Sequence, residues 1–539
     1  EGHRSPSGFS VRGQISKEDL VQRVHEVMSD PDLQKCADLQ ESACAVICLV
    51  ATNSTELRGK FGAAGCIQLV LRVAKLHESA ELQVISCNAL RALSLDTADA
   101  QSLLVESGGI DYALSAMKEN AGEFRVQVAG CTLMQLLASK EDDVEIRRRL
   151  VANGALEATL HAMEVHEDNH EVLLVALLLV STLCCDGPEP RERGLKGEGL
   201  RRVLLALRSE IADSDTAERG CQLFDSYAAD SIACRTQLLA EGCDAVPFVA
   251  TCSIQHPKRI EMQFYICSFI LKLASDAPES RKRTGELGGV AAVIDAMRAS
   301  LRKTHVEACG CNALMQLSTR CPENVQRIVE EKGIKAVCMS MFKSEEDMAL
   351  QEAGCGALRF VMADSEDTPD EVDDLGGLQI VMAALEKFPM SPGVQEHGLC
   401  CIANLCWHHP DNQETVVLKG GVELALNAIR NHPDQAKVIA FACASLHGIS
   451  NDHKRHREVL GRSGAIPLII EAMERHPDMA NVQAYACAAL QSMACGSFAN
   501  KRAVIQHQAE DLAINAMEVH PRAWKLQEFA QMLLDTLGK

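Results

Sequence analysis

The sequence predicts an all-α protein, a solenoid of about twelve three-helix repeats with a period of about 44 residues. Three observations lead to this prediction. Apolar residues recur with helical spacing, a glycine stands at a fixed place between two helical runs, and a small apolar residue, usually Cys, returns every 43–46 residues.

Residues 464–494 show the repeat most clearly. A first run places four apolar residues at i, i+3, i+4 and i+7, on one face of a helix: Ile466, Ile469, Ile470 and Met473. The segment His476-Pro477-Asp478 breaks that helix. A second run shares another face: Val482, Ala486, Ala489, Leu490 and Met493. Two helices that each bury one stripe need the same unit on either side of them.

Two independent positions carry the period along the chain. The third helix has Cys44, Cys87, Cys131, Leu177, Cys221, Cys267, Cys311, Cys355, Leu399, Cys443, Cys487 and Gln531. The end of the second helix has Ala74, Met117, Met163, Leu207, Thr251, Met297, Met341, Leu385, Ile429, Met473 and Met517. Both series place small insertions between Cys131 and Met163 and between Thr251 and Cys267, which argues against a chance periodicity.

A short first helix precedes a glycine corner in each repeat. The glycines in register are Gly65, Gly108, Gly154, Gly242, Gly288, Gly376, Gly420 and Gly464, whereas Gly199 and Gly333 come one residue late. Glycine suits the left-handed position that ends one helix and turns the chain into the next.

Three helices, this period, the glycine corner and a C-x-A-L-x-x-L third helix resemble armadillo repeats over about residues 17–539, which implies a right-handed α-solenoid. The sequence pattern GG…AM..H…VQ..AC.AL also resembles the armadillo segments of leucine-rich-repeat kinases and of uncharacterised single-cell eukaryote proteins. Residues 1–16 are expected to form a flexible tail. Gln531 and Asp535 predict a polar C-terminal capping repeat within the solenoid of residues 17–539. Because the first residue is not Met, we expect a fragment or a processed form.

Composition restricts the partners and the compartment. The net charge of −21 disfavours nucleic acid and anionic membranes as ligands. Of the 24 cysteines, nine occupy the recurring third-helix position, about one repeat apart and too far for disulfides, so a reducing compartment is expected. That compartment is the cytoplasm or another reducing one, and an organelle reached after loss of a targeting peptide stays open. The uncharged stretch Val172–Cys185 is 14 residues long, short of the roughly 20 that span a bilayer.

Catalytic and metal-binding motifs do not emerge from the sequence. We find no P-loop, no G-x-S-x-G and no H-E-x-x-H, and expect neither enzyme activity nor a cofactor. The cluster from Cys400 to His409 lacks the paired spacing of a zinc site, so no metal is expected. Five histidines at the ends of second helices are assigned a structural role: His166, His256, His432, His476 and His520. Basic runs in the short helices are either solvated or form a strip for an acidic partner.

The resemblance implies that the third helices line a concave groove for a partner protein or peptide. The Trp and Asn arrays of importin-α-type carriers are missing, and only Asn404 occupies the expected Asn position, so the groove is not importin-α-like. The predicted partner-binding residues are Asn312, Gln316, Phe360, Asn404, Trp407 and His408, with Leu136, Leu174 and Leu178 as a second, apolar site suited to a partner helix. The alternative for Trp407 is that it packs at the helix end against the next repeat.

These observations favour a non-enzymatic scaffold or adaptor that binds a partner protein along the groove. Two alternatives stay open. The chain could be a fixed structural subunit of a large ciliary or organellar assembly. It could also be the regulatory arm of a larger enzyme, although the polar last repeat argues against an array that continues past Lys539.

Overall fold

The structure is a computed structural model that describes residues 16–95, 97–139, 144–195, 199–209, 211–229, 231–363, 367–407, 409–451 and 453–538. Within these residues the regular secondary structure is helical throughout, with no strand. The all-α prediction and the three-helix repeat are confirmed. The predicted tail lies outside the described residues except for Ser16, whose hydroxyl accepts a hydrogen bond from the Asp19 N–H (3.0 Å) and so caps the first helix.

The described residues form two compact units, one ending at Gln237 and the other starting at Leu238. The helices of the first unit, the last of which crosses this boundary by one residue, are α1 (Lys17–Ser29), η1 (Leu33–Lys35), α2 (Ala37–Asn53), α3 (Thr55–Ala63), α4 (Cys66–Ala74), α5 (Ala80–Ser94), α6 (Ala98–Glu106), α7 (Gly109–Glu119), α8 (Phe124–Ala138), α9 (Val144–Ala152), α10 (Ala155–Val165), α11 (His170–Leu183), α12 (Pro188–Leu195), α13 (Gly199–Ser209), α14 (Ser214–Ala228) and α15 (Ile232–Leu238).

The second unit repeats the same three elements. Its helices are α16 (Ala245–Gln255), α17 (Ile260–Ala274), α18 (Pro278–Glu286), α19 (Gly289–Ala299), α20 (Thr304–Ser318), α21 (Pro322–Glu330), α22 (Gly333–Lys343), α23 (Met348–Met362), α24 (Thr368–Asp374), α25 (Gly377–Lys387), α26 (Pro392–Cys406), α27 (Pro410–Leu418), α28 (Gly421–Asn431), α29 (Ala436–Ser450), α30 (Lys454–Arg462), α31 (Ala465–Arg475), α32 (Ala480–Ala494), α33 (Phe498–Gln506), α34 (Ala509–Val519) and α35 (Trp524–Leu537).

The corner between the first and second helices is left-handed, as the glycine spacing predicts. All eight glycines in register have φ between 74° and 95°. Where the glycine comes one residue late, at Gly333, the preceding Lys332 takes the left-handed conformation itself (φ 56°), and Gln508 does the same in the last repeat (φ 56°). The corner geometry is therefore kept even where its usual residue is missing.

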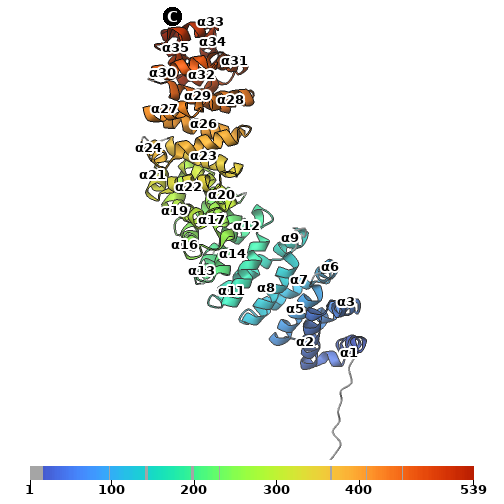
Figure 1. Ribbon diagram of the computed structural model, residues 1–539. Helices are drawn as coiled ribbons and strands as arrows, with labels where there is room; N and C mark the ends of the chain where they lie inside the picture. Colours follow the sequence, from blue (N-terminus) through green and yellow to red (C-terminus); the bar gives the residue numbers. More distant parts are fainter. Residues whose placement is uncertain are drawn as a thin grey trace, which may run out of the picture. The chain divides into compact units, whose positions relative to one another are not determined.

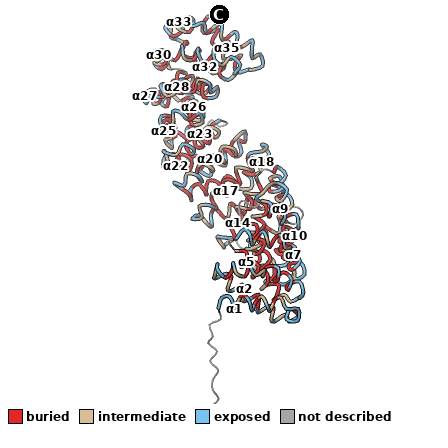
Figure 2. Tube along the Cα trace, turned by 90° about the vertical axis from the view of Figure 1, so that its right-hand side faces the viewer, coloured by how far each residue is buried: buried red, intermediate tan, exposed pale blue. Residues whose placement is uncertain are grey.

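Third helices pack against one another in chain order and form the layer that holds each unit together. In the first unit α2, α5, α8, α11 and α14 follow in turn, and in the second unit α17, α20, α23, α26, α29, α32 and α35 do so (Figure 1). Buried residues lie between these helices and their neighbours, and exposed residues lie outside (Figure 2). Of the 24 cysteines, 18 are buried and every one is a free thiol, in agreement with their prediction as small core residues.

Glutamines of the third helices satisfy carbonyl groups at the ends of the second helices. Gln483 Nε2 donates to the Met473 and His476 carbonyl oxygens, both at 2.8 Å. The equivalent residues make the same pair of bonds in other repeats: Gln83, Gln127, Gln351, Gln395 and Gln527. These bonds fix the angle between the second and third helices, since the last carbonyls of a helix have no partner within it.

Arginines of the first helices join consecutive repeats. Arg457 Nε donates to Ser450 O (3.1 Å) and Nη1 donates to Cys495 O (2.8 Å), so one side chain bridges the ends of two third helices. Three equivalent arginines also bridge two such ends: Arg58, Arg191 and Arg281. Because these guanidinium groups bond to backbone carbonyls, the choice between a solvated face and a strip for an acidic partner stays open only for the other basic residues of the short helices.

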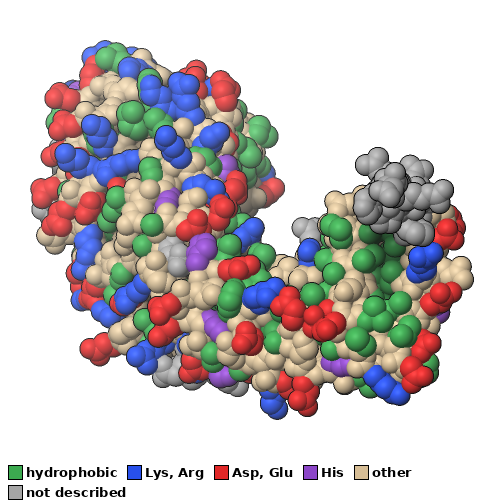
Figure 3. Space-filling model, turned by 90° about the horizontal axis from the view of Figure 1, so that it is seen from below, with side chains coloured by type: hydrophobic (Ala, Val, Ile, Leu, Met, Phe, Trp, Pro, Cys, Tyr) green, Lys and Arg blue, Asp and Glu red, His purple; other side chains and the backbone are tan. Residues whose placement is uncertain are grey.

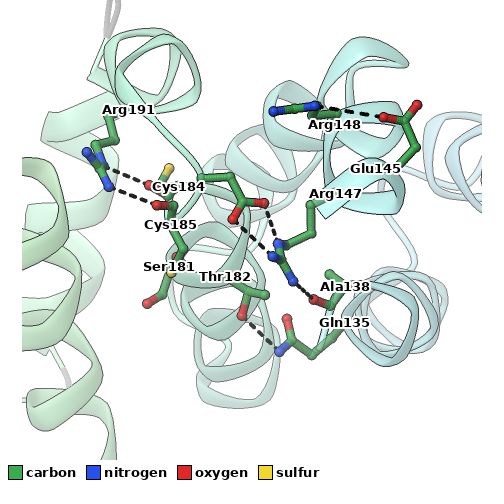
Figure 4. A network of polar contacts seen from close by, with 11 residues as sticks. Gln135, Ala138, Glu145, Arg147, Arg148, Ser181, Thr182, Cys184, Cys185 and Arg191 are labelled. Carbon is green, nitrogen blue, oxygen red and sulfur yellow. Dashed lines mark hydrogen bonds and ion pairs between the residues drawn. The ribbon is translucent and has the colours of Figure 1, made fainter. Parts of the chain in front are cut away.

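Arg147 stands at the repeat position of Arg191, 44 residues earlier. It bonds to one helix-end carbonyl and, in place of the carbonyl of the next third helix, to a carboxylate. Its guanidinium donates to Ala138 O (3.1 Å) and forms a two-point ion pair with Asp186, one bond of which measures 3.0 Å (Figure 4). The neighbouring Arg148 points away from this network toward Glu145, at 4.0 Å (Figure 4). Adjacent arginines in the sequence therefore have different roles, because they lie about 100° apart around the helix.

Four of the five histidines predicted to be structural have such a role. His432, His476 and His520 bond through Nε2 to the carbonyl of a proline 43 residues earlier, in the equivalent turn of the preceding repeat, at 2.9, 2.7 and 2.8 Å. His166 bonds in the same way to Ala121 O (2.8 Å). The partner is a carbonyl of the previous repeat, not the end of the histidine's own helix.

Two further predictions concern single helices, the polar cap in α35 and the uncharged stretch in α11. In α35, Gln531 and Asp535 are exposed and bond to each other (2.9 Å), while the capping role stays a prediction. Residues of the stretch Val172–Cys185 form most of α11. Among the described helices, none is both long enough and apolar enough to cross a membrane.

Candidate partner-binding groove

Residues of five third helices of the second unit, α20, α23, α26, α29 and α32, and of their ends line an open groove of about 460 Å³, here called the third-helix groove. Its lining consists of Met315, Gln316, Thr319, Arg359, Phe360, Glu396, His397, Ala436, Lys437, Ala440, Phe441, Met479, Asn481, Val482 and Tyr485. Apolar rings and a few polar groups that converge on one space are the usual composition of a binding site.

Arg359 is fixed in the groove by two aromatic rings and two hydrogen bonds. Its guanidinium lies 4.2 Å from the ring centroid of Phe441 and 5.1 Å from that of Phe360. Nη1 donates to Glu396 Oε1 and to His397 Nδ1, both at 3.0 Å. Because a guanidinium can only donate, His397 Nδ1 is the acceptor and the ring proton resides on Nε2. Burial, followed by the charge of Arg359, lowers the pKa of His397, so this ring is neutral at neutral pH.

A row of rings extends from the groove toward the C-terminal end of the second unit. Phe441 lies 6.3 Å from Tyr485, and Tyr485 lies 6.5 Å from Phe529, measured between ring centroids. His447 lies 6.0 Å from Phe529 and 5.2 Å from Trp407. All of these centroid separations lie within the range typical of aromatic pairs. In a chain that has only 4% aromatic residues, this row brings three aromatic rings and Trp407 together on four third helices.

The structure brings together some of the predicted partner-binding residues. Gln316 and Phe360 both line the third-helix groove. Asn312 on α20 and Asn404 on α26 are half-buried and are not part of its lining. His408 lies outside the described residues.

Trp407 has features of both roles considered for it. It is the residue that ends α26, its side chain is 43% exposed, and its ring contacts His447 on α29 of the next repeat. Contact with the next repeat agrees with the packing alternative, while the exposure leaves part of the ring available. Its role in binding stays a prediction.

The second, apolar site falls on the first unit. Leu136 on α8 and Leu174 and Leu178 on α11 are half-buried, and α8 packs against α11. This placement puts the three leucines on neighbouring helices. Their binding role stays a prediction as well.

Sequence analysis missed four residues of the groove and its ring row: Arg359, Phe441, Tyr485 and Phe529. The three rings stand two residues before the recurring Cys position of their helices, and Arg359 stands four residues after it. The sequence does hold the signal, since Phe441, Tyr485 and Phe529 are spaced 44 residues apart. Glu396 with His397, and Ala440 with Phe441, line the groove as adjacent pairs, so the groove is wider than one helical stripe.

In the segment Cys400–His409, the described residues Cys401, Cys406 and His409 make separate contacts. Cys401 is buried and donates its thiol to Cys355 O (3.3 Å), and Cys406 is buried elsewhere on α26. His409 pairs with Asp370 at 3.3 Å.

Comparisons with known proteins agree with this architecture. The family model described as the LRRK2 ARM repeat matches residues 361–539. A chain from the solved structure that reports a conserved phosphorylation switch controlling the interaction between cadherin and beta-catenin is similar in fold. The TM-score is 0.78 at 15% sequence identity, and the match covers 96% of this chain and 98% of that chain. No curated protein sequence matches the chain. The repeat, the corner, the stacked third helices and these two matches together show that the chain has the armadillo-repeat fold.

Proposed function

We propose that the chain is a non-enzymatic scaffold that binds an extended segment of a partner protein in the third-helix groove. The observation that carries the proposal is the guanidinium of Arg359, placed between Phe360 and Phe441 and fixed by Glu396 and His397. Its partners keep the two rings at the groove surface in one orientation. A surface that is ordered before binding loses less entropy when a partner docks.

The chemistry of the groove favours a partner segment with an apolar anchor and a carboxylate. Phe360, Phe441 and Tyr485 offer ring faces for the anchor. The Lys437 side chain is 78% exposed, and its ammonium lies 3.9 Å from Glu396, which is already bonded to Arg359. Lys437 is therefore well placed for an acidic group of the partner. Amides such as Gln316 and Asn481 supply hydrogen bonds for a peptide backbone.

The surface charge supports a protein partner over nucleic acid. On the face drawn in Figure 3, Lys and Arg side chains are interspersed with Asp and Glu side chains. The net charge of −21 adds a general repulsion of polyanions. The structural relative also supports the proposal, since the solved structure that contains it concerns an interaction between two proteins, cadherin and beta-catenin. We further propose a reducing compartment, because the cysteines occupy core positions as free thiols.

The test compares single ring removals on and off the groove. Peptides selected from a displayed library on the wild-type chain are titrated against Phe360→Ala, Phe441→Ala and Trp407→Ala. The matched control is Phe342→Ala, since Phe342 belongs to α22 and is 61% exposed outside the groove. We expect Phe360→Ala and Phe441→Ala to weaken binding about thirtyfold, the loss typical of an interface hot spot, with the control unchanged.

Thermal melting of the same variants separates binding from folding. A large fall in the melting temperature of the Phe360 and Phe441 variants would show that these rings serve the core, and the proposed groove function would have to be abandoned. Peptide binding that survives both groove substitutions would exclude the groove as the site. Stoichiometric co-purification with many subunits would favour the fixed structural subunit instead.

A further inference from the structure

We propose that Glu414, His453 and His456 bind a divalent transition-metal ion of the Zn²⁺ class between two consecutive repeats of the second unit. The three side chains belong to α27 and to the start of α30, which are the short first helices of those repeats (Figure 1). One ligand atom from each lies within 4.8 Å of the other two. The site is separate from the third-helix groove.

The repeat itself fixes which ring nitrogen of His456 carries the proton. Positions 324, 412 and 500, each a multiple of 44 residues away, hold Asn. Their amide nitrogens donate to the carbonyl seven residues earlier, at 3.0 Å in all three cases: Leu317, Leu405 and Met493. At 456 the ring Nδ1 makes the equivalent bond, 3.2 Å from Ile449 O. His456 thus replaces the amide donor, and its Nδ1 carries the hydrogen.

Nε2 of His456 then faces Glu414 Oε2 at 2.9 Å, and a carboxylate oxygen can only accept. Either a second ring proton or a metal cation must therefore lie between these two atoms. The His456 side chain is fully buried, whereas that of Glu414 is 34% exposed, so an ion from solvent can reach the pair from the carboxylate side. A metal cation in this place leaves the buried ring neutral. The bond from Nδ1–H to a backbone carbonyl is also what metal-binding histidines use to fix their orientation.

A third ligand is already adjacent. His453 Nδ1 is buried and has no hydrogen-bond partner, an arrangement that costs free energy unless something binds the atom. The His453 ring is stacked on His456, with 3.8 Å between centroids and 13° between planes. Ion binding would turn it out of the stack, since a metal lies in the plane of each imidazole that it ligates. Arg455 holds the other carboxylate oxygen, Glu414 Oε1, at 3.2 Å, which leaves Oε2 for the ion.

Two imidazoles and one carboxylate suit Zn²⁺ and its neighbours in the transition series. Three protein ligands leave a fourth position for water or for a group from another molecule. The equivalent place in the preceding repeat holds only the pair Asp370 and His409, with Asn412 where His456 stands. That repeat lacks one imidazole and so provides a natural comparison.

The experiment titrates Zn²⁺ alone into the full chain after its accessible thiols have been blocked with N-ethylmaleimide, so that cysteines do not compete. Calorimetry should show one tight site per chain, and Co²⁺ should give a visible d–d band without thiolate charge transfer. The key variant is His456→Asn, which restores the residue found at 324, 412 and 500 and keeps the backbone hydrogen bond. We expect it, and Glu414→Gln, to weaken Zn²⁺ binding by more than the roughly 10–100-fold that outer-shell changes cost.

His409→Gln is the matched control and should leave the titration unchanged. Zn²⁺ should also raise the melting temperature of the wild-type chain and not that of His456→Asn, because an ion that binds only the folded state stabilises it. Wild-type and His456→Asn chains with the same Zn²⁺ affinity would overturn the proposal. So would a wild-type chain with no tight site, and His456 and Glu414 would then be a proton-bridged ion pair.

Discussion

Single side chains that reach helix-end carbonyls hold each unit together. Arginine, glutamine and histidine side chains at fixed repeat positions bond to carbonyls that a helix leaves without partners, as with Arg457, Gln483 and His476. Each bond crosses from one element or one repeat to another. Because a bond to a charged group stabilises more than a neutral one, the arginine position matters most.

Replacing Arg147 by Ala should lower the free energy of unfolding by about 3 kcal/mol, the low end for breaking a buried ion pair. Arg147 and Asp186 have side chains only 8% and 15% exposed, so Asp186 would be left as a largely desolvated charge. Arg148→Ala is the control, since that side chain is 69% exposed and should change stability by less than about 0.5 kcal/mol. Denaturant unfolding measures both. Equal effects for the two arginines would contradict the structural role given to Arg147.

Most thiols should be unreactive in the folded chain. Burial raises the pKa of Cys66 to about 11 and that of Cys131 to about 12, so these groups stay protonated at neutral pH. Thiol titration should find Cys36 first, because burial raises the pKa of Cys185, the other exposed cysteine, and its thiol donates to Ser181 O (3.2 Å). After denaturation without reductant it should find all 24. A clear shortfall would mean that disulfides form in solution, which would refute the reducing compartment.

At the scale of the helix, the corner before the second helix determines how each repeat is joined. Gly464 has φ 80° and open space around the position of a Cβ, so only its backbone conformation requires glycine there. Inside the third helix, glycine is required for lack of space instead, since a Cβ on Gly354 would lie 2.5 Å from Met341 Cγ. The two glycines are therefore needed for different reasons.

Lys332→Gly should stabilise the chain by up to about 1 kcal/mol. A residue with a Cβ pays about 1–2 kcal/mol to adopt the left-handed conformation, and glycine avoids this cost while losing some entropy on folding. Gln508→Gly should act in the same direction, and Gly464→Lys in the opposite one. Melting temperatures of the three variants provide the measurement. A destabilised Lys332→Gly would show that the Lys332 side chain makes a contact worth more than the strain.

Periodicity predicted the helices, the corners and the buried Cys positions, because these depend on local conformation and on which face is apolar. It could not predict that Arg147 is buried and Arg148 is exposed, since a one-residue difference in register decides this. Gln316 and Phe360, each five residues after the Cys position, do line the groove, while their part in binding stays a prediction. Arg359 was not predicted, because its place depends on Phe441 and Glu396, which come from two other repeats.

Within the whole molecule, third helices pack chiefly against the third helices before and after them in the chain. In the second unit, α32 packs against α29 and α35. Stability in such an array is a sum of nearest-neighbour terms. The family match to residues 361–539 lies entirely in this unit, which also contains the third-helix groove and the proposed metal site.

Leu490→Ala should cost about 2–5 kcal/mol by leaving a cavity, because Leu490 is fully buried. The loss should be local. Hydrogen exchange should become faster in α29, α32 and α35, with the helices of the first unit unchanged, and Leu358→Ala should act likewise around α23. Exchange that rises equally in every repeat would contradict a one-dimensional array.

The two tryptophans give the molecule an optical property that follows from their positions. Trp407 is 43% exposed beside His447, and Trp524 is 68% exposed. Because both indoles already contact water in the folded chain, unfolding shifts their emission wavelength less than it would shift that of a buried tryptophan. Intrinsic fluorescence is therefore a weak monitor of unfolding. It is a sensitive monitor of events near His447, since a protonated imidazole at 5.2 Å quenches an indole and a docked chain would shield it from solvent. Trp524→Phe leaves Trp407 as a single built-in reporter at the end of the ring row.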